Sequence, residues 1–189
     1  MTGKEVFKFL YPIMYLLIRL FKVLPLWLRY FLLDCFSLVP SKIGVGIRYV
    51  LVSSMCKSIG RNVYIGRFVI IKNITSLSIG DNVSIHDYCY LDAIGGININ
   101  DDVSIAHSSS LISFEHFYGE DDTPIKYSGL VLGDINIERN VWIGCGVRIL
   151  SNSYIKTKVI VAAGSVVRGE LKSSSIYAGV PARKVKDIV

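Results

Sequence analysis

The sequence predicts an all-β protein: a parallel β-helix of about five coils, with an apolar helical segment before it and a protruding loop near residues 112–134. Three observations predict this fold. Aliphatic residues recur every six positions from residue 59 onwards, small residues often follow them, and residues 6–33 are apolar without that period. We therefore expect a helical segment over residues 1–57 and a β-helix domain with a C-terminal tail over residues 58–189.

The N-terminal segment is apolar and basic. From Val6 to Leu33, 22 of 28 residues are apolar, but the longest uncharged stretch, residues 9–18, is about half of what a membrane span needs. We expect Pro12 and Pro25 to divide it into short helices. On a helical projection its basic residues share an arc of roughly 80°; they are Lys4, Lys8, Arg19, Lys22 and Arg29. Such helices lie in an anionic bilayer interface; packing on the protein or a neighbouring subunit is the alternative.

Charge is divided unevenly along the chain. Residues 6–80 hold ten basic and one acidic side chain, whereas residues 81–189 hold ten basic and thirteen acidic ones. The basic half is also the apolar half, and no helix-turn-helix, RNA-recognition or zinc-finger pattern occurs. The sequence therefore favours an anionic membrane surface over nucleic acid as a partner. The four cysteines lie far apart without a C-x-x-C pair, which indicates a reduced protein.

The rest of the chain is a repeat. Residues 58–77, 78–97, 98–117 and 136–155 align, and each unit carries an aliphatic residue every six positions. Neither helical heptads nor strand alternation gives a period of six, whereas three short strands joined by tight corners do. Each coil is then one turn of a triangular prism, stacked on the next at about 4.8 Å. Leu111 and Ile137 are 26 residues apart, so a long polar excursion interrupts the prism, and such loops are usually functional.

Four segments carry a family resemblance: INIERNVWIGCGVRI, VAAGSVVRGE, YAGVPARKVK and a histidine-bearing loop ending in DDTPI. Residues 58–187 resemble the hexapeptide-repeat acyltransferases, above all the galactoside/maltose and bacterial surface-polysaccharide (colanic-acid and O-antigen type) O-acetyltransferases. The resemblance implies a left-handed β-helix, a homotrimer, acetyl-CoA as cosubstrate and no metal. The acceptor would be a hydroxyl of a sugar or glycan precursor.

The resemblance also implies roles for residues around the acceptor. His116 stands where the family has a loop histidine that removes the hydroxyl proton, which requires a neutral imidazole. His86 occupies a position where galactoside-type enzymes carry an acceptor-binding asparagine, which leaves the acceptor open. The other acceptor-side candidates are Asp87, Asp92 and Glu115, with Trp142 beside the acyl group and Glu120, Asp121 and Asp122 in the loop.

For the cofactor, the resemblance implies a groove between two prisms of the trimer. Gly144, Cys145 and Ala163 match main-chain contacts to CoA. Arg168 stands where the family has Thr-Lys and would contact a phosphate, and Arg183 and Lys186 match the cations that meet the nucleotide phosphates.

Two other functions compete with acetyl transfer. A zinc-dependent carbonic anhydrase uses the same fold with three histidines, and this chain has three, His86, His107 and His116. The metal enzymes place two of them five residues apart, whereas the nearest pair here is nine apart, and His107 fits a structural corner position better. A non-catalytic scaffold in polysaccharide assembly is the other alternative. With acetyl-CoA as cosubstrate, we expect the protein in the cytoplasm, at the inner face of the cytoplasmic membrane.

Overall fold

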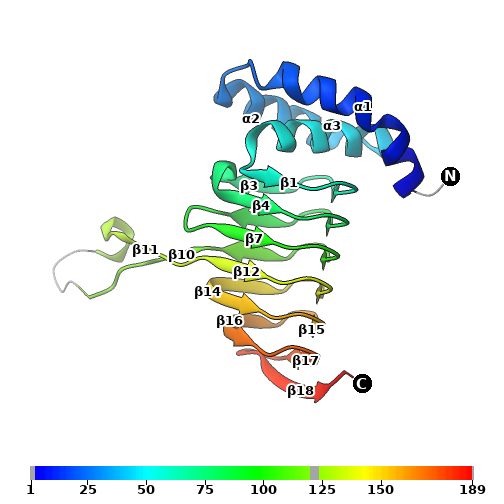
Figure 1. Cartoon of the computed structure of the whole chain (residues 1–189). Helices are drawn as coiled ribbons and strands as arrows, with labels where there is room; N and C mark the ends of the chain where they lie inside the picture. The colour runs from blue at the N-terminus through cyan, green and yellow to red at the C-terminus, as the bar shows by residue number, and fades with distance from the viewer. Residues whose placement is uncertain (1–2, 120–123, 189) are drawn as a thin grey trace.

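The computed structural model describes residues 3–119 and 124–188. It is a left-handed parallel β-helix with helices across its N-terminal end and a two-stranded arm on its side (Figure 1). The predicted fold class is thus confirmed. In the described part of the chain the first face has six rungs, close to the five coils expected.

Three faces form the prism. The first face contains β1 (Ser58–Ile59), β4 (Leu77–Ile79), β7 (Ile97–Ile99), β12 (Ile135–Ile137) and the C-terminal parts of β14 (Arg148–Ile155) and β16 (Val166–Leu171). The second face contains β2 (Tyr64–Ile65), β5 (Ser84–Ile85), β8 (Ser104–Ile105), β13 (Trp142–Ile143), β15 (Val159–Val161), β17 (Ser175–Ala178) and the antiparallel β18 (Arg183–Asp187). The third face contains β3 (Ile70–Lys72), β6 (Tyr90–Asp92), β9 (Ser110–Ile112) and the N-terminal parts of β14 and β16.

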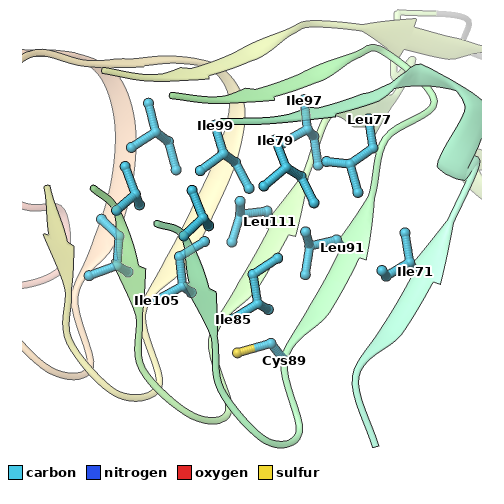
Figure 2. Close-up of a cluster of buried hydrophobic side chains, with 14 of the residues drawn as sticks. Ile71, Leu77, Ile79, Ile85, Cys89, Leu91, Ile97, Ile99, Ile105 and Leu111 are labelled. Carbon is cyan, nitrogen blue, oxygen red and sulfur yellow. The ribbon is translucent and has the colours of Figure 1, made fainter. Parts of the chain in front are cut away.

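The core of the prism is a ladder of aliphatic side chains at the hexad positions. Ile79 pairs with Ile99 on the first face, Ile85 with Ile105 on the second, and Leu91 with Leu111 on the third. Figure 2 shows these side chains meeting inside the prism, where each is almost fully buried. Burying one such side chain contributes about 1.5–3 kcal/mol, so the ladder fixes the register of every coil.

Corner loops join the faces, and loops of successive coils stack on one another. We call them the first, second and third corners, after the face that precedes each. The second corner comprises residues 66–68, 86–88, 106–108, 144–146 and 162–164, and the third includes 73–76, 93–96, 113–119, 124–134 and 150–152. Carboxylates hold successive loops together: Asp81 accepts a hydrogen bond from the backbone N–H of Arg61 at 2.6 Å.

The helical cap comprises α1 (Gly3–Phe21), α2 (Leu26–Cys35), the short 3-10 turn η1 (Phe36–Leu38) and α3 (Ser41–Met55). The prediction that Pro12 ends a helix is wrong, because Pro12 lies inside α1. Packing of α1 on α3, with Met14 buried, outweighs the roughly 3 kcal/mol that an interior proline costs. Pro25 does separate α1 from α2, as predicted.

The predicted basic stripe is only partly exposed. Lys8, Arg19 and Lys22 are exposed, whereas the half-buried Arg29 donates a hydrogen bond to the carbonyl of Ser54. The side chain of Lys4 lies outside the described residues. No helix in the described ranges, 3–119 and 124–188, is both long and apolar enough to cross a bilayer.

Helix α3 closes the end of the prism. The buried Arg48 donates from Nε to the Ile65 carbonyl at 2.9 Å and from Nη1 to the Val39 carbonyl at 2.9 Å. Burial lowers the pKa of its guanidinium, and the carbonyls satisfy the donors. Tyr49 adds a hydrogen bond to the Gly60 carbonyl at 3.0 Å. The cap and the prism therefore share one continuous core.

Candidate active site

The polar excursion in the repeat forms an arm at the third corner. Strand β10 (Phe114–His116) pairs antiparallel with β11 (Leu130–Leu132), and η3 (Ile125–Tyr127) lies beyond them. Figure 1 shows the arm projecting from the side of the prism at mid-height. The arm falls within the predicted range of 112–134, and it carries the predicted catalytic histidine.

His116 ends β10 with its imidazole exposed. Its ring meets Phe114 edge-on, with centroids 6.3 Å apart. Beside it lies an open hollow of about 380 Å³, which is within the range of small-molecule sites. The residues that line this hollow are Glu115, His116, Phe117, Tyr118, Gly119, Val131, Asn152 and Arg168.

Glu115 fixes the base of the arm to the prism. Its Oε1 accepts hydrogen bonds from Ser151 Oγ at 2.8 Å and from Arg168 Nη2 at 2.8 Å. Successive residues of a strand point to opposite sides, so the side that anchors Glu115 leaves the His116 imidazole on the other. The pair of contacts therefore sets the position of β10 and of the histidine next to Glu115.

Three of the residues predicted to bind CoA, Gly144, Cys145 and Ala163, lie along the second corner. Cys145 and Ala163 stack there, and the backbone N–H of Gly164 donates to the Cys145 carbonyl at 2.9 Å. A Cβ on Gly144 would meet the backbone N of Ala163 at 2.6 Å, so only glycine fits between these coils. At this corner Gly144 is buried between the coils, whereas Ala163 and Gly164 are exposed.

Other predicted residues lie near the same corner. His86 is exposed two coils before Cys145, with its ring 5.4 Å from that of Tyr64. Trp142, on β13, is 54% exposed beside the corner. Arg183 and Lys186 are exposed on β18, at the end of the second face. The second corner thus holds three of the six cofactor candidates together with His86.

Asp87 and Asp92 have structural partners. Asp87 accepts from the backbone N–H of Arg67 at 2.8 Å and forms an ion pair with its guanidinium at 3.4 Å. Asp92 is 8% exposed and accepts from Asn73 Nδ2 at 2.7 Å. Their acceptor contacts stay predictions. The loop carboxylates Glu120, Asp121 and Asp122 lie outside the described residues.

One chain does not bring all the candidates together. His116, Glu115 and Arg168 meet at the third corner, whereas Cys145 and Ala163 lie at the second corner. Arg168 pairs with Glu115 at the arm, and its contact with a CoA phosphate stays a prediction. His86 and His107 share the second corner, away from His116. Within residues 3–119 and 124–188, no group of histidine, cysteine and acidic side chains is arranged to hold a metal.

Sequence reasoning missed Ser151 and Asn152. Both belong to the third corner, where Ser151 binds Glu115 and Asn152 lines the hollow beside His116. Their only signal is their place in the repeat, two and three residues after the aliphatic Ile149. That place puts them in the corner that stacks under the arm.

Curated relatives share part of the chain. A Mycobacterium tuberculosis protein named as an acetyltransferase, Rv3034c, is 32% identical over 77 residues, which cover 41% of this chain and 26% of the relative. An Escherichia coli protein named as a lipopolysaccharide biosynthesis O-acetyl transferase, WbbJ, is 36% identical over 66 residues, 35% of this chain and 31% of the relative. The match thus spans about a third or less of these relatives, and no protein-family model matches the chain.

Solved structures match more of the chain. A galactoside acetyltransferase in complex with coenzyme A is 26% identical, with a TM-score of 0.77 over 86% of this chain and 80% of that one. The chain is similar in sequence and fold to hexapeptide-repeat acetyltransferases. A Vibrio cholerae hexapeptide-repeat acetyltransferase complexed with acetyl coenzyme A shares the fold, at 23% identity and a TM-score of 0.77 over 87% of both chains.

The likeness extends to an N-acyltransferase that was solved with a nucleotide. A variant of AntD, an N-acyltransferase from Bacillus cereus, was solved with dTDP and coenzyme A; it is 28% identical, with a TM-score of 0.58 over 71% of this chain and 86% of that one. The structures similar to this hexapeptide-repeat chain therefore include enzymes that hold CoA.

Proposed function

We propose that this protein transfers an acetyl group from acetyl-CoA to a hydroxyl of a sugar or of a surface-polysaccharide precursor. The observation that carries the proposal is an exposed histidine, His116, beside an open hollow on an arm that Glu115 anchors, in a chain similar to CoA-bound acetyltransferases. The name of the E. coli relative supports a glycan acceptor.

In the proposed reaction His116 is the general base. Its neutral imidazole takes the proton of the acceptor hydroxyl while the oxygen attacks the thioester carbonyl. The C–S bond then breaks, the acetyl group stays on the acceptor oxygen, and the proton passes to the departing CoA sulfur. Cys145 and Ala163 would contact the pantetheine arm along the second corner, and Arg183 and Lys186 offer cations to phosphates.

The positions of the two candidate groups support a homotrimer. His116 belongs to the third corner and Cys145 to the second, so a neighbouring copy that sets its third corner against this second corner would complete the site. Three such contacts close a ring. Light scattering at micromolar concentration should show a trimer, and an active monomer would contradict this part of the proposal.

The surface of the cap supports attachment to an anionic membrane at the cytoplasmic face. Phe9 and Trp27 are among many apolar side chains exposed on α1 and α2, close in sequence to Lys8, Arg19 and Lys22. Each basic residue near such a surface contributes about 1 kcal/mol, lost at high salt. Reversing the charge of these three residues should abolish salt-sensitive co-sedimentation with phosphatidylglycerol vesicles and leave the trimer intact. Equal sedimentation of the variant and the native chain would refute the attachment.

The decisive test of the activity is His116→Ala. We expect kcat to fall by roughly 10²–10⁴ with CoA affinity retained, because a general base acts in the transition state. Lys126→Ala, on the same arm outside the hollow, controls for disturbance of the arm and should change kcat by less than about twofold. Full activity of His116→Ala would refute the assignment. If the native protein transferred no acetyl group to sugars, nucleotide sugars or lipid-linked glycans, that result would favour the alternative function, a non-catalytic scaffold in polysaccharide assembly.

A further inference from the structure

Two adjoining apolar hollows lie between α1 and α3 of the cap. They measure about 350 and 290 Å³, and both are lined by Leu10, Met14, Lys42 and Gly46. The second extends down to Val63 of the first coil. The two hollows adjoin at these four residues, and each is large enough for a small-molecule site.

Gly46 keeps this space open. A Cβ built on it would meet no atom within 4 Å, whereas a Cβ on Gly44, one half-turn earlier, would collide with the Val39 carbonyl. Packing therefore explains Gly44 but not Gly46. A glycine inside a helix costs about 1 kcal/mol relative to alanine, so an unforced glycine at position 46 indicates that an empty space is of use there.

The lining of these hollows is apolar apart from one lysine and a few polar groups, which suits a hydrocarbon ligand with an anionic end. In the first hollow, Lys42 is the only lining residue that is not apolar. Lys42 is exposed, and it has no acidic partner among the described residues. Its neighbour Ile43 is 71% exposed, so the mouth of the hollow opens onto apolar surface. An apolar space with one exposed cation on its lining complements a hydrocarbon chain that carries a negative charge.

We propose that the two hollows hold a single hydrocarbon chain of an anionic phospholipid, with Lys42 beside its phosphate. This inference rests on the proposed attachment to a membrane and names the lipid class that the cap selects. The cap would then do more than lie on a bilayer, because it would draw one lipid chain between α1 and α3.

Monomeric lysophosphatidylglycerol tests the site without a bilayer. Native mass spectrometry and calorimetry should show one molecule per chain. Gly46→Leu places a side chain in the open space and should weaken binding at least about tenfold, a change of about 1.4 kcal/mol. Gly46→Ala is the matched control: it makes the same backbone change, adds one methyl group, and should weaken binding only a few-fold. Thermal unfolding checks that both variants fold.

Lys42→Glu tests the charge. The residue lies in the first turn of α3, where an acidic side chain suits the helix dipole, so the variant should fold. The native chain should bind lysophosphatidylglycerol more tightly than monoacylglycerol of the same chain length. Lys42→Glu should remove that preference. An unchanged preference in Lys42→Glu would overturn the role of Lys42.

The outcomes separate this inference from the proposals above. If Gly46→Leu binds the lysolipid as the native chain does, or if the native chain binds none, the inference is wrong. Self-association that Gly46→Leu abolishes would also overturn it, because a second copy would then fill the space. Binding of the lysolipid by a chain that ignores vesicles would refute the membrane attachment alone. Loss of acetyl transfer in His116→Ala leaves lipid binding unaffected.

Discussion

The prism buries leucine side chains along its axis, whereas the arm leaves leucine side chains exposed to solvent. Leu111, on the last strand before the arm, is fully buried, whereas Leu132, on the strand that returns from it, is 54% exposed. The prism satisfies its strands and fills its axis without help from the arm. The difference teaches that the fold's stability resides in the ladder, which leaves the arm free to present His116 and apolar surface outside it.

Leu111→Ala and Leu132→Ala form a matched pair that tests this comparison. The first leaves a cavity in a packed ladder and should lower the free energy of unfolding by about 2–5 kcal/mol. The second removes exposed side-chain atoms and should change it by less than about 0.5 kcal/mol. Urea unfolding of the two variants measures both. Equal losses of unfolding free energy in the two variants would show that the arm stabilises the prism, which would contradict this comparison.

Glu115 connects the two regions, so its substitution should move activity more than stability. Glu115→Ala loses both contacts of β10 with the prism, and we expect kcat to fall about tenfold through misplacement of His116. Glu115→Gln keeps an oxygen that Ser151 can bind and should lose less. The Arg168–Glu115 pair is largely exposed, so unfolding should change by no more than about 1 kcal/mol.

A purely structural Glu115 would give another pattern. It would lower stability and leave kcat per folded molecule unchanged, which steady-state kinetics and thermal unfolding distinguish together. Glu170→Gln provides the control, because Glu170 is an exposed glutamate on the same strand as Arg168, and it should retain native kcat and stability.

The sequence predicts the prism far better than the cap or the site. Period-six spacing determines which residues face the axis, and it pairs Ile137 with Ile99 across the excursion, as observed. That pairing follows because an aliphatic side chain on the wrong face would break the ladder. The repeat also indicates where the arm leaves, because 26 residues separate Leu111 from Ile137, whereas eight separate Leu91 from Ile99 at the preceding boundary between units.

Tertiary packing determines what the sequence could not predict. Pro12 continues α1, and Arg29 turns inward to Ser54, because α1 and α2 pack on α3. Neither outcome has a local signal. The Arg168–Glu115 pair joins residues 53 positions apart and brings Arg168 to a residue beside His116, a contact that the repeat does not indicate.

The four cysteines lie in the cap and in the prism, and their reactivity toward an alkylating reagent gives the prediction with the smallest expected effect. Burial raises the pKa of Cys56 and of Cys89 to about 11, so neither thiol should react with iodoacetamide near neutral pH. Cys35 is exposed on the cap, and Cys145 is partly exposed at the second corner. We therefore expect alkylation at Cys35 and Cys145 only.

CoA should then separate these two cysteines. If the cofactor lies along the second corner, bound CoA covers the Cys145 backbone and should slow alkylation of its thiol a few-fold, in proportion to occupancy. Cys35, on the helical cap, should react at an unchanged rate and so reports any general effect of CoA on the reagent. Peptide mass spectrometry gives both rates from one sample. If CoA slowed alkylation at Cys35 alone, or at neither residue, the cofactor would lie away from the second corner. The arm with His116 would then be the part of the predicted site that keeps support.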